Sequence, residues 1–530
     1  MTPDARVAEL LATFDRPELN LAELLCDRHP ADEVAFTIVQ PDLSSVDLTF
    51  GELRERSSAL AAALAEMGVE PGDRVATLMG KSLDYVVTVL GLWRAGAVHV
   101  PLFTAFAPPA IALRLEGAEA KMVVCDPGQR SKLDPGEDIP ADARWAVLTV
   151  DEMPKGDPAK APVVQASGET EFIRLFTSGT TGTPKGVPIP VKAVASFVTY
   201  LEYGLYVTED DVFWNAADPG WAYGLYYAII APMAAGRRSL LLQAGFSTDL
   251  TWQVLSTFGV TNLAAAPTVF RSLRSAGGDI PGDLRLRRMS SAGEPLNPEM
   301  VTWAKETLGV PIHDTYGQTE LGMCVVNGWH PDVSGPVKEG SMGRPMPGWS
   351  MAVLEDLSDE HAAPGELGRV AVDLANSPGM WFSGYVDAPE KTAERFSPDG
   401  RWYLTGDAGT MDEDGYIFFS ARDDDVIIMA GYRIGPFEVE SVLVAHPSVA
   451  EAAVVGMPDE LRGEVIEAFV VLAPGVAASD ELADSLKQRV KTKLAAHAYP
   501  RTVHFVEELP KTPSGKIQRF VLRSRGAAGA

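Results

Sequence analysis

The sequence predicts an α/β fold with two unequal domains, and three patterns along the chain point to it. In the first third, strands expected at 74–79, 97–102 and 121–125 alternate with helices at about 49–67 and 82–95. Such a βαβ rhythm is typical of a largely parallel sheet. After Pro345 come short β segments at 351–354, 368–372 and 415–419, which suggest a β-rich, barrel-like subdomain. From Asp423 onward, strands at 426–429, 449–455 and 468–471 and a helix at 480–497 indicate a small α+β unit.

These patterns divide the chain into residues 1–422 and residues 423–530. The first helix carries a start signal, because Thr49 stands three residues before Glu52 in a capping-box pattern. Strand and helix patterns return at Phe172 and continue to about Asp314. The tail 523–530, rich in Gly and Ala, is expected to fray.

Composition excludes several classes of protein. Of 530 residues, 46% are hydrophobic and 22% charged, which rules out a disordered chain, a collagen-like chain and a disulfide scaffold. The 45 Lys and Arg residues against 72 Asp and Glu give a net charge of −27. That excess argues against broad binding to nucleic acid or an anionic membrane, while a local phosphate site stays open.

Cysteines and apolar runs predict a cytoplasmic protein. Cys26, Cys125 and Cys324 are scattered, without a CxxC pair or zinc spacing, so we expect reduced thiols. The N-terminus has no long apolar region of the secretory type. The most apolar stretch, 223–236, is interrupted by Gly224 and Pro232 and is too short to span a bilayer.

The most informative segment is residues 177–186, TSGTTGTPKG, which directly follows the apolar strand expected at 172–176. Glycines let a backbone approach a ligand closely, and N–H groups and hydroxyls can surround phosphate oxygens. Lys185 adds a positive charge. The spacing is not that of a Walker A loop. A flexible Ser/Gly/Thr loop is the weaker alternative, so we expect a phosphate-binding loop.

Four further segments have ordinary readings on their own. Residues 291–296 read as a Gly-Pro turn, and Asp407 after Gly406 reads as a turn residue. Residues 314–320, DTYGQTE, fit a helix start capped by Asp314 about as well as a purine and Mg²⁺ site. Residues 510–519, PKTPSGKIQR, read as a surface loop.

Together, these motifs and their order resemble the acyl-adenylate-forming superfamily of AMP-binding enzymes. The resemblance runs from about Leu48 to Arg519. Within that superfamily the segment 218–224, DPGWAYG, is similar to acetyl- and medium-chain acyl-CoA synthetases. The resemblance implies ATP, Mg²⁺ and CoA as ligands and a small C-terminal domain that acts as a mobile lid.

The resemblance also implies site residues. Catalytic roles would fall to Lys516, Thr319 and Glu320, and Glu320 and Thr181 would hold the metal. Asp407 would bind both ribose hydroxyls with Arg422 as a second ribose contact, although Ala421 replaces the family's usual glycine. The remaining ATP- and AMP-binding residues would be Thr177, Ser178, Gly179, Thr180, Thr181, Gly182, Lys185, Gly293, Glu294, Pro295, Asp314, Thr315, Tyr316, Gly317, Gln318 and Arg433.

The implied reaction has two steps. A carboxylate would attack the α-phosphorus of ATP to give acyl-AMP and pyrophosphate, and the CoA thiol would then take the acyl group. Between the steps the lid would rotate about Asp424, replacing the Lys516 loop by a loop in which Gly431 flanks the CoA arm. Of the acidic turn 423–425, we expect Asp423 and Asp425 to be solvated.

The acyl pocket is predicted around Trp221 and Gly317. Acetate-specific relatives carry a tryptophan at the position of Gly317, so a glycine there would leave room for an acid larger than acetate: short- to medium-chain, branched or aryl.

Two other functions stay open: a stand-alone adenylation enzyme that loads a carrier protein, or a nucleotide-binding protein without catalysis. Lys516 and Glu320 argue against the second. No nucleic acid or transmembrane segment is expected among the partners, and both a monomer and a homodimer fit the sequence.

Overall fold

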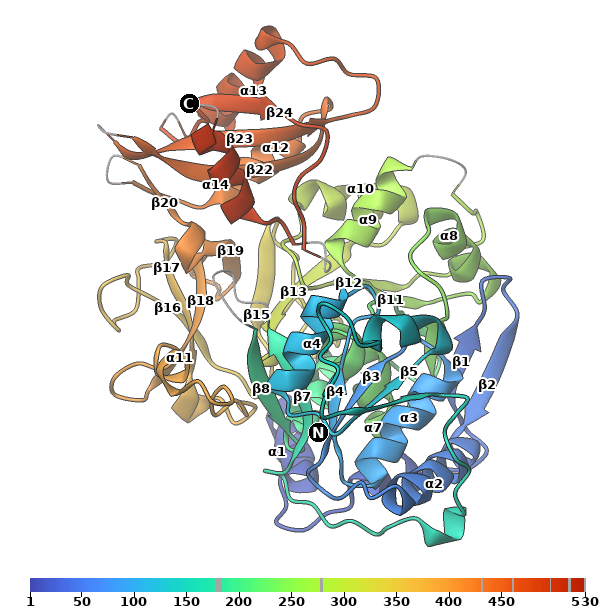
Figure 1. Ribbon diagram of the computed structural model, residues 1–530. Helices are drawn as coiled ribbons and strands as arrows, with labels where there is room; N and C mark the ends of the chain where they lie inside the picture. The colour runs from blue at the N-terminus through green and yellow to red at the C-terminus, as the bar shows by residue number, and fades with distance from the viewer. Residues whose placement is uncertain are drawn as a thin grey trace.

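The computed structural model describes residues 1–177, 184–276, 280–429, 432–459, 462–495, 497–512 and 516–528 (Figure 1). It contains a large N-terminal domain and a smaller C-terminal one, drawn in orange and red in Figure 1. None of the helices in these ranges is long and apolar enough to cross a membrane. Cys26, Cys125 and Cys324 are buried free thiols.

The first third of the chain forms a six-stranded sheet in the order β6-β5-β3-β4-β7-β8. All neighbours run parallel except β7 and β8. Its strands are β3 (Arg74–Leu78), β4 (Val98–Pro101), β5 (Met122–Cys125), β6 (Ala146–Thr149), β7 (Glu171–Thr177) and β8 (Lys185–Pro190). The helices of this region are α2 (Phe50–Glu66), α3 (Leu83–Arg94) and α4 (Pro108–Gly117). The Thr49–Glu52 capping box is present at the start of α2.

A second, 13-stranded sheet joins the α/β and β-rich parts of the large domain. Its parallel section contains six strands, which in spatial order are β1 (Val34–Val39), β10 (Ser239–Leu242), β9 (Phe213–Asn215), β11 (Asn262–Ala265), β12 (Arg288–Ser291) and β13 (Ile312–Gln318). Strand β2 (Ser45–Thr49) lies antiparallel to β1 at the edge of the sheet. The section beyond β13 is antiparallel: β14 (Gly322–Val326), β15 (Ser341–Pro345), β19 (Ile417–Arg422), β18 (Trp402–Met411), β17 (Gly368–Asp373) and β16 (Met351–Leu354).

The most apolar stretch of the sequence lies inside the large domain. It forms η5 (Leu225–Ile230) and α7 (Ala231–Ala235), next to α5 (Ala193–Thr199), and η5 is buried along its whole length. A segment that is hydrophobic on all sides belongs in a core. The other helices of the large domain are α1 (Pro3–Phe14), α6 (Ala222–Gly224), α8 (Thr248–Thr257), α9 (Pro267–Ser275), α10 (Pro298–Leu308) and α11 (Pro389–Ala393).

The C-terminal domain is built on a five-stranded sheet in the order β21-β20-β23-β22, with β24 beside β23. Its elements are β20 (Ile427–Met429), β21 (Tyr432–Ile434), α12 (Pro436–Val444), β22 (Val449–Asp459), β23 (Gly463–Leu472), α13 (Asp480–Lys493), β24 (Thr502–Phe505) and α14 (Arg519–Ala528). The predicted frayed tail is wrong as far as Ala528, because α14 extends through it and Arg523 of that helix donates to Asp425 at 2.5 Å.

Asp425 also corrects the expectation of a solvated acidic turn. Its carboxylate is buried and receives Arg523 and, at 3.4 Å, Arg519. Asp423 is exposed, as expected. The turn 423–425 is therefore tied to the last helix of the small domain through the Asp425 carboxylate and the Asp424 carbonyl.

Candidate active site

The predicted motifs lie where strands of the two large-domain sheets end. Thr177 closes β7 and Lys185 opens β8, Ser291 closes β12, and β13 carries residues 312–318. Asp407 lies on β18, paired with Arg422 at the end of β19. The carboxyl ends of parallel strands are the usual ligand-binding edge of α/β sheets.

Asp407 is the centre of a dense hydrogen-bond network. It is 3% exposed. Its Oδ2 accepts hydrogen bonds from the Tyr316 hydroxyl at 2.5 Å and from Gln318 Nε2 at 2.7 Å. Its Oδ1 lies 3.4 Å from the Arg422 guanidinium, and this carboxylate raises the pKa of Arg422. The network holds the carboxylate in place before any ligand arrives.

Asp314 lies within strand β13, so the alternative of a helix start capped by Asp314 is wrong. Its side chain is buried, and burial raises the pKa of its carboxyl well above the usual value. Its Oδ1 has no partner within the part of the chain that the structure describes. The neighbouring Thr315 donates to the Ser291 carbonyl at 2.8 Å, which ties β13 to β12.

Residues 293–295 form the loop after β12. Gly293 has φ +96°, a conformation that side-chain-bearing residues rarely adopt. Glu294 is anchored by the Thr268 hydroxyl at 2.8 Å and by Arg271 at 2.7 Å. Pro295 follows within the same loop. Helix α9, which carries Thr268 and Arg271, thereby fixes the direction of the Glu294 side chain.

Glu320 and Lys185 lie on either side of Tyr385. The Tyr385 hydroxyl donates to Glu320 Oε1 at 2.7 Å, and the Lys185 ammonium lies 4.7 Å from the centre of the Tyr385 ring. Burial lowers the pKa of Lys185, and the nearby Arg395 lowers it further. Thr319 accepts a hydrogen bond at its backbone carbonyl from Tyr226 at 3.1 Å.

Lys516 comes to this site from the C-terminal domain. Its charge interacts with those of Arg422, Asp407, Glu294 and Glu320. The residue is exposed. Surrounding protein atoms nevertheless lower the pKa of its ammonium, with a smaller lowering effect from Arg422 and opposing effects from the carboxylates. Lys516 thus lies within electrostatic range of three acids of the large domain.

Arg433 does not join them. Its guanidinium forms an ion pair with Asp356, in the loop between β16 and β17. Asp424 lies in the one-turn helix 423–425, where its carbonyl accepts from Arg523 at 3.4 Å. The predicted residues Ser178, Gly179, Thr180, Thr181, Gly182 and Gly431 lie outside the described residues.

Gly317 does not face open space, contrary to the expectation from sequence. A Cβ added to it would lie 2.0 Å from the backbone oxygen of Gly322 on the neighbouring strand. Glycine is needed here because β13 and β14 approach closely at a bulge. A substitution at Gly317 would disturb this pairing, so it cannot report on the acyl pocket.

Trp221 lies within a cluster of three aromatic rings. Its ring centre is 5.4 Å from those of Phe103 and Phe106, and these two are 5.8 Å apart. Phe103 follows β4 of the six-stranded sheet, whereas Trp221 follows β9 of the other sheet. The cluster joins the carboxyl ends of the two sheets with an apolar surface.

The residues present fit one metal ligand rather than a metal cage. Across the described ranges, no three His, Cys, Asp or Glu side chains cluster around a common point. Glu320 is 7% exposed, and only its Oε1 is used by Tyr385. A single carboxylate is consistent with Mg²⁺ sites that are completed by phosphate oxygens and water.

Sequence reasoning missed Tyr385, Tyr403 and Arg395. Arg395 donates to the Tyr385 hydroxyl at 3.2 Å and to the Thr405 carbonyl at 2.9 Å, and Tyr403 donates to Gln318 at 3.2 Å. Gly406, with φ +72°, leaves room for Arg395, because a Cβ there would lie 2.3 Å from its guanidinium. In the sequence, the glycine directly before Asp407 was the one indication that another group approaches the backbone closely at this point.

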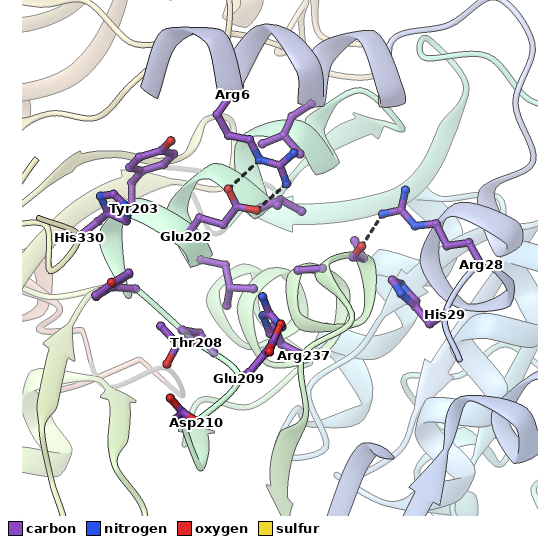
Figure 2. Close-up of a pocket in the computed structure, with 17 residues that line it drawn as sticks. Arg6, Arg28, His29, Glu202, Tyr203, Thr208, Glu209, Asp210, Arg237 and His330 are labelled. Carbon is purple, nitrogen blue, oxygen red and sulfur yellow. Dashed lines mark hydrogen bonds and ion pairs between the residues drawn. The ribbon is translucent and has the colours of Figure 1, made fainter. Parts of the chain in front are cut away.

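A cavity of about 570 Å³ lies elsewhere, between α1 and the segment around Tyr203. Figure 2 shows Arg6 and Glu202 pointing toward each other across it, joined at 2.7 Å and 3.0 Å. Arg28 and His330 also line it. None of the site residues predicted from sequence contributes to this cavity.

Comparison with known proteins identifies the class. A sequence profile of the AMP-binding enzyme family matches residues 23–386, and the profile of the C-terminal domain of AMP-binding enzymes matches residues 438–516. The chain therefore belongs to the AMP-binding enzymes, and its relatives place it in the acyl-CoA synthetase branch.

Three relatives are informative. The chain is 38% identical to the acetyl-coenzyme A synthetase of Bacillus subtilis over 90% of this chain and 84% of that protein. It is 45% identical to the crystal structure of an acyl-CoA synthetase from Brucella canis, with a TM-score of 0.74 over 99% of this chain and 97% of that one. An anthranilate CoA ligase crystallised with anthranoyl-AMP is 28% identical, with a TM-score of 0.85 over 97% and 98% of the two chains.

Proposed function

We propose that this protein activates a carboxylic acid with ATP and transfers the acyl group to CoA. The acid's carboxylate attacks the α-phosphorus, pyrophosphate leaves, and acyl-AMP forms. The thiol of CoA then attacks the acyl carbon, loses its proton, and releases AMP. The observation that carries the proposal is that Lys516, from the small domain, lies close enough to Glu294, Glu320 and Asp407, from the large domain, for their charges to act on its ammonium.

In the first step, negative charge develops on the phosphate oxygens, so catalysis depends on positive charge placed beforehand. Lys185 and Lys516 supply it. Mg²⁺, when bound, would neutralise phosphate charge, with Glu320 as its protein ligand together with Thr181. Thr319 lies beside the α-phosphate.

The nucleotide binds, in this proposal, between the loop 293–295 and strand β13. Tyr316 lies against adenine, and Gly317 and Gln318 continue the wall past Asp314 and Thr315. Asp407 and Arg422 hold the ribose. The segment from Thr177 to Gly182 surrounds the phosphates. The prior fixing of Asp407 by two hydrogen bonds supports this arrangement.

We place the domain boundary between Arg422 and Asp423, with Asp424 as the hinge. The small domain turns about it after adenylation and withdraws Lys516. Gly431 then flanks the CoA arm and Arg433 contacts phosphate. The separate sheet of residues 427–505 supports the boundary.

The acid is larger than acetate: short- to medium-chain, branched or aryl. The aromatic rings of Trp221, Phe103 and Phe106 support this choice of acid. Gly317 does not support it, because backbone of the neighbouring strand occupies the space beside it. We further propose a cytoplasmic location, because all three thiols are buried and unpaired. The oligomeric state, monomer or homodimer, is a separate question for sedimentation analysis.

The decisive experiment is a panel of acids, from acetate to benzoate, assayed for ATP–pyrophosphate exchange and for AMP release with CoA. Exchange with at least one acid, followed by thioester formation on CoA, is the expected result. Exchange without transfer to CoA would favour the carrier-protein enzyme. ATP binding without exchange for any acid would indicate a nucleotide-binding protein without catalysis.

A further inference from the structure

Two opposite charges face each other across the edge where the two large-domain sheets meet. Lys81 follows shortly after β3 of the six-stranded sheet, and Asp218 follows shortly after β9 of the 13-stranded sheet. Both side chains are partly exposed. Both therefore lie at carboxyl ends of parallel strands, where α/β proteins bind ligands.

The loop that carries Asp218 is held rigidly. Asp218 Oδ1 accepts from the Gly220 N–H at 2.8 Å, and the Asp218 carbonyl accepts from the Trp221 N–H at 3.1 Å. A Cβ at Gly220 would lie 2.7 Å from the Cα of Phe103, so the loop is in backbone contact with the other sheet. Asp218 is thereby fixed beside the aromatic cluster of Trp221.

Neither side chain forms an ion pair with another described residue, although each has one hydrogen-bond contact with the backbone. Throughout the described chain no ion pair joins Lys81 to Asp218, and the Lys81 ammonium reaches only the Ala216 carbonyl, at 3.5 Å. Burial lowers the pKa of Lys81 and raises the pKa of Asp218, and each charge partly opposes that shift in the other. Charges that are partly removed from water and do not pair with each other are costly, and a polar group bound between them would reduce that cost.

We propose that Lys81 and Asp218 form a two-point site for one neutral hydrogen-bonding group of a substrate. The ammonium of Lys81 donates to an oxygen of that group, and the carboxylate of Asp218 accepts its O–H or N–H. A neutral group fits because the two side-chain charges cancel, so a charged group would leave one of them unpaired. This inference rests on the proposed function, since it concerns the same site.

A hydroxyl and an amide share this donor-and-acceptor chemistry, and each has one source in the reaction. The hydroxyl would belong to the acid, next to the apolar part that the rings of Trp221 and Phe103 contact. The amide would belong to the extended arm of CoA, which carries an N–H and a carbonyl together. The first source acts in adenylation and the second only in thioester formation.

The test uses Lys81→Met and Asp218→Asn in the full-length protein, with two arms. One arm compares matched acids with and without a hydroxyl by ATP–pyrophosphate exchange in the absence of CoA. The other compares CoA with cysteamine, a thiol without an amide, in thioester formation from synthetic acyl-AMP. In one of the two arms, we expect each variant to reduce the wild-type preference, either for the hydroxylated acid or for CoA, by about tenfold. This is the usual scale of one charge-assisted hydrogen bond.

Lys121 and Asp73 provide the matched control. They form a Lys–Asp pair on the same sheet, but these two charges meet directly, at 2.5 Å. Lys121→Met and Asp73→Asn should leave both preferences unchanged. Lys81→Arg keeps the donor and should retain most of the preference. If Lys81→Met fails to fold, Asp218→Asn decides, because it keeps the shape of the loop.

Equal losses of kcat/KM for every acid and every thiol would overturn the inference and leave the pair a structural contact. Unchanged preference in both arms would also overturn it. The absence of exchange with every acid in the wild type is a different result, because it overturns the proposed function, and the inference falls with it.

Discussion

The Asp407 network and the Lys516 loop meet at one site, but they are held in opposite ways. Asp407 is buried, and two side chains of β13 donate hydrogen bonds to it. Lys516 is exposed, and its backbone N–H donates to the Thr512 hydroxyl at 3.1 Å. The proposed ribose-binding half of the site is therefore fixed in advance, whereas the proposed catalytic cation belongs to the C-terminal domain.

Within the described ranges, few polar side-chain contacts join the C-terminal domain to the large domain. Asn297 reaches Ser441 at 3.4 Å, and Ser420 donates to Glu438 at 3.0 Å. Arg433 pairs with Asp356. Small, polar interfaces between domains permit relative motion. With Lys516 at the site and Arg433 held away from it, the structure has the arrangement that we propose for adenylation.

The largest expected effect comes from Lys516→Ala, which removes the cation but not the fixed half. Formation of acyl-AMP from acid and ATP should fall by about 10³-fold, the scale of losing one preplaced donor to a developing charge. Thioester formation from synthetic acyl-AMP and CoA should continue at a substantial rate. The two half-reactions are measured separately.

Lys511→Ala is the control, since Lys511 lies in the same loop but pairs with Glu451 at 2.6 Å. It should leave both half-reactions intact. Equal loss of both in folded Lys516→Ala would give the lysine a general binding role and remove the contrast between the two halves.

Asp424→Pro tests the motion itself. A 3₁₀ turn needs φ near the value that proline fixes, so the arrangement seen here is retained. Rotation about this residue is restricted, and so is the residue before it. Adenylation should persist while thioester formation falls by about 10²-fold, the scale on which misplacing reacting groups slows an enzyme. A variant that transfers acyl groups normally would move the hinge elsewhere.

Local patterns were enough to predict much of the fold. The capping box at Thr49 and the βαβ rhythm depend on neighbouring residues, and both appear in the structure. The structure of the C-terminal segment could not be predicted from local patterns. Helix α14 is stabilised by Arg519 and Arg523 reaching Asp425, about a hundred positions earlier. The composition of the last residues alone could not predict a contact with a residue so far away in the sequence.

The candidate site shows the same limit. Asp407, Tyr316 and Lys516 were found through short motifs, yet Tyr385 and Arg395 stand in no motif and enter through contacts with Glu320 and Thr405. The error at Gly317 has a physical origin. A glycine in sequence indicates a missing side chain, but only the pairing of β13 with β14 shows that backbone occupies the place.

Asp407→Ala tests the fixed half. Removing the carboxylate takes away the charge-assisted hydrogen bonds that we propose it accepts from the ribose hydroxyls, which costs roughly 1–3 kcal/mol in ATP affinity. The expected rise in the dissociation constant for ATP, about 5- to 150-fold, is measured by titration calorimetry. Asp414→Ala, an exposed acid just after the same strand, should leave the constant unchanged. Unaltered ATP affinity in Asp407→Ala would make Asp407 a turn residue only.

The alkaline limb of the pH profile tests the role of the Lys516 ammonium separately from that of the Asp407 network. The surrounding protein atoms, with a smaller effect from Arg422, lower the pKa of Lys516, so its ammonium loses its proton at a lower pH than an ordinary lysine. Activity that needs the ammonium is present below that pKa and is lost as pH rises through it. We expect kcat/KM for adenylation to fall by about tenfold per pH unit before pH 10.4, while thioester formation from acyl-AMP shows no such limb.

Lys516→Arg is the companion variant, because a guanidinium stays protonated throughout this range. Its residual adenylation activity should not fall at alkaline pH. A limb that survives in Lys516→Arg would belong to another group, and the charged state of Lys516 would no longer explain it.

The smallest effect is expected for Asp356→Ala, which removes the large-domain partner of Arg433 without touching the site. Exposed ion pairs contribute about 0.2–1 kcal/mol, so the balance between the two arrangements should shift by about 1.5- to 5-fold toward the one that forms thioester. Adenylation should slow by that factor while its KM for ATP stays constant, because Asp407 and its partners are unchanged. The measurement is single-turnover acyl-AMP formation. Asp359→Ala, which removes another exposed ion pair within the same loop, to Arg369, provides the control and should have no effect. If Asp356→Ala instead changed the KM for ATP and left the rate of acyl-AMP formation unchanged, the Arg433–Asp356 pair would act on nucleotide binding. The proposed balance between two domain arrangements would then be contradicted.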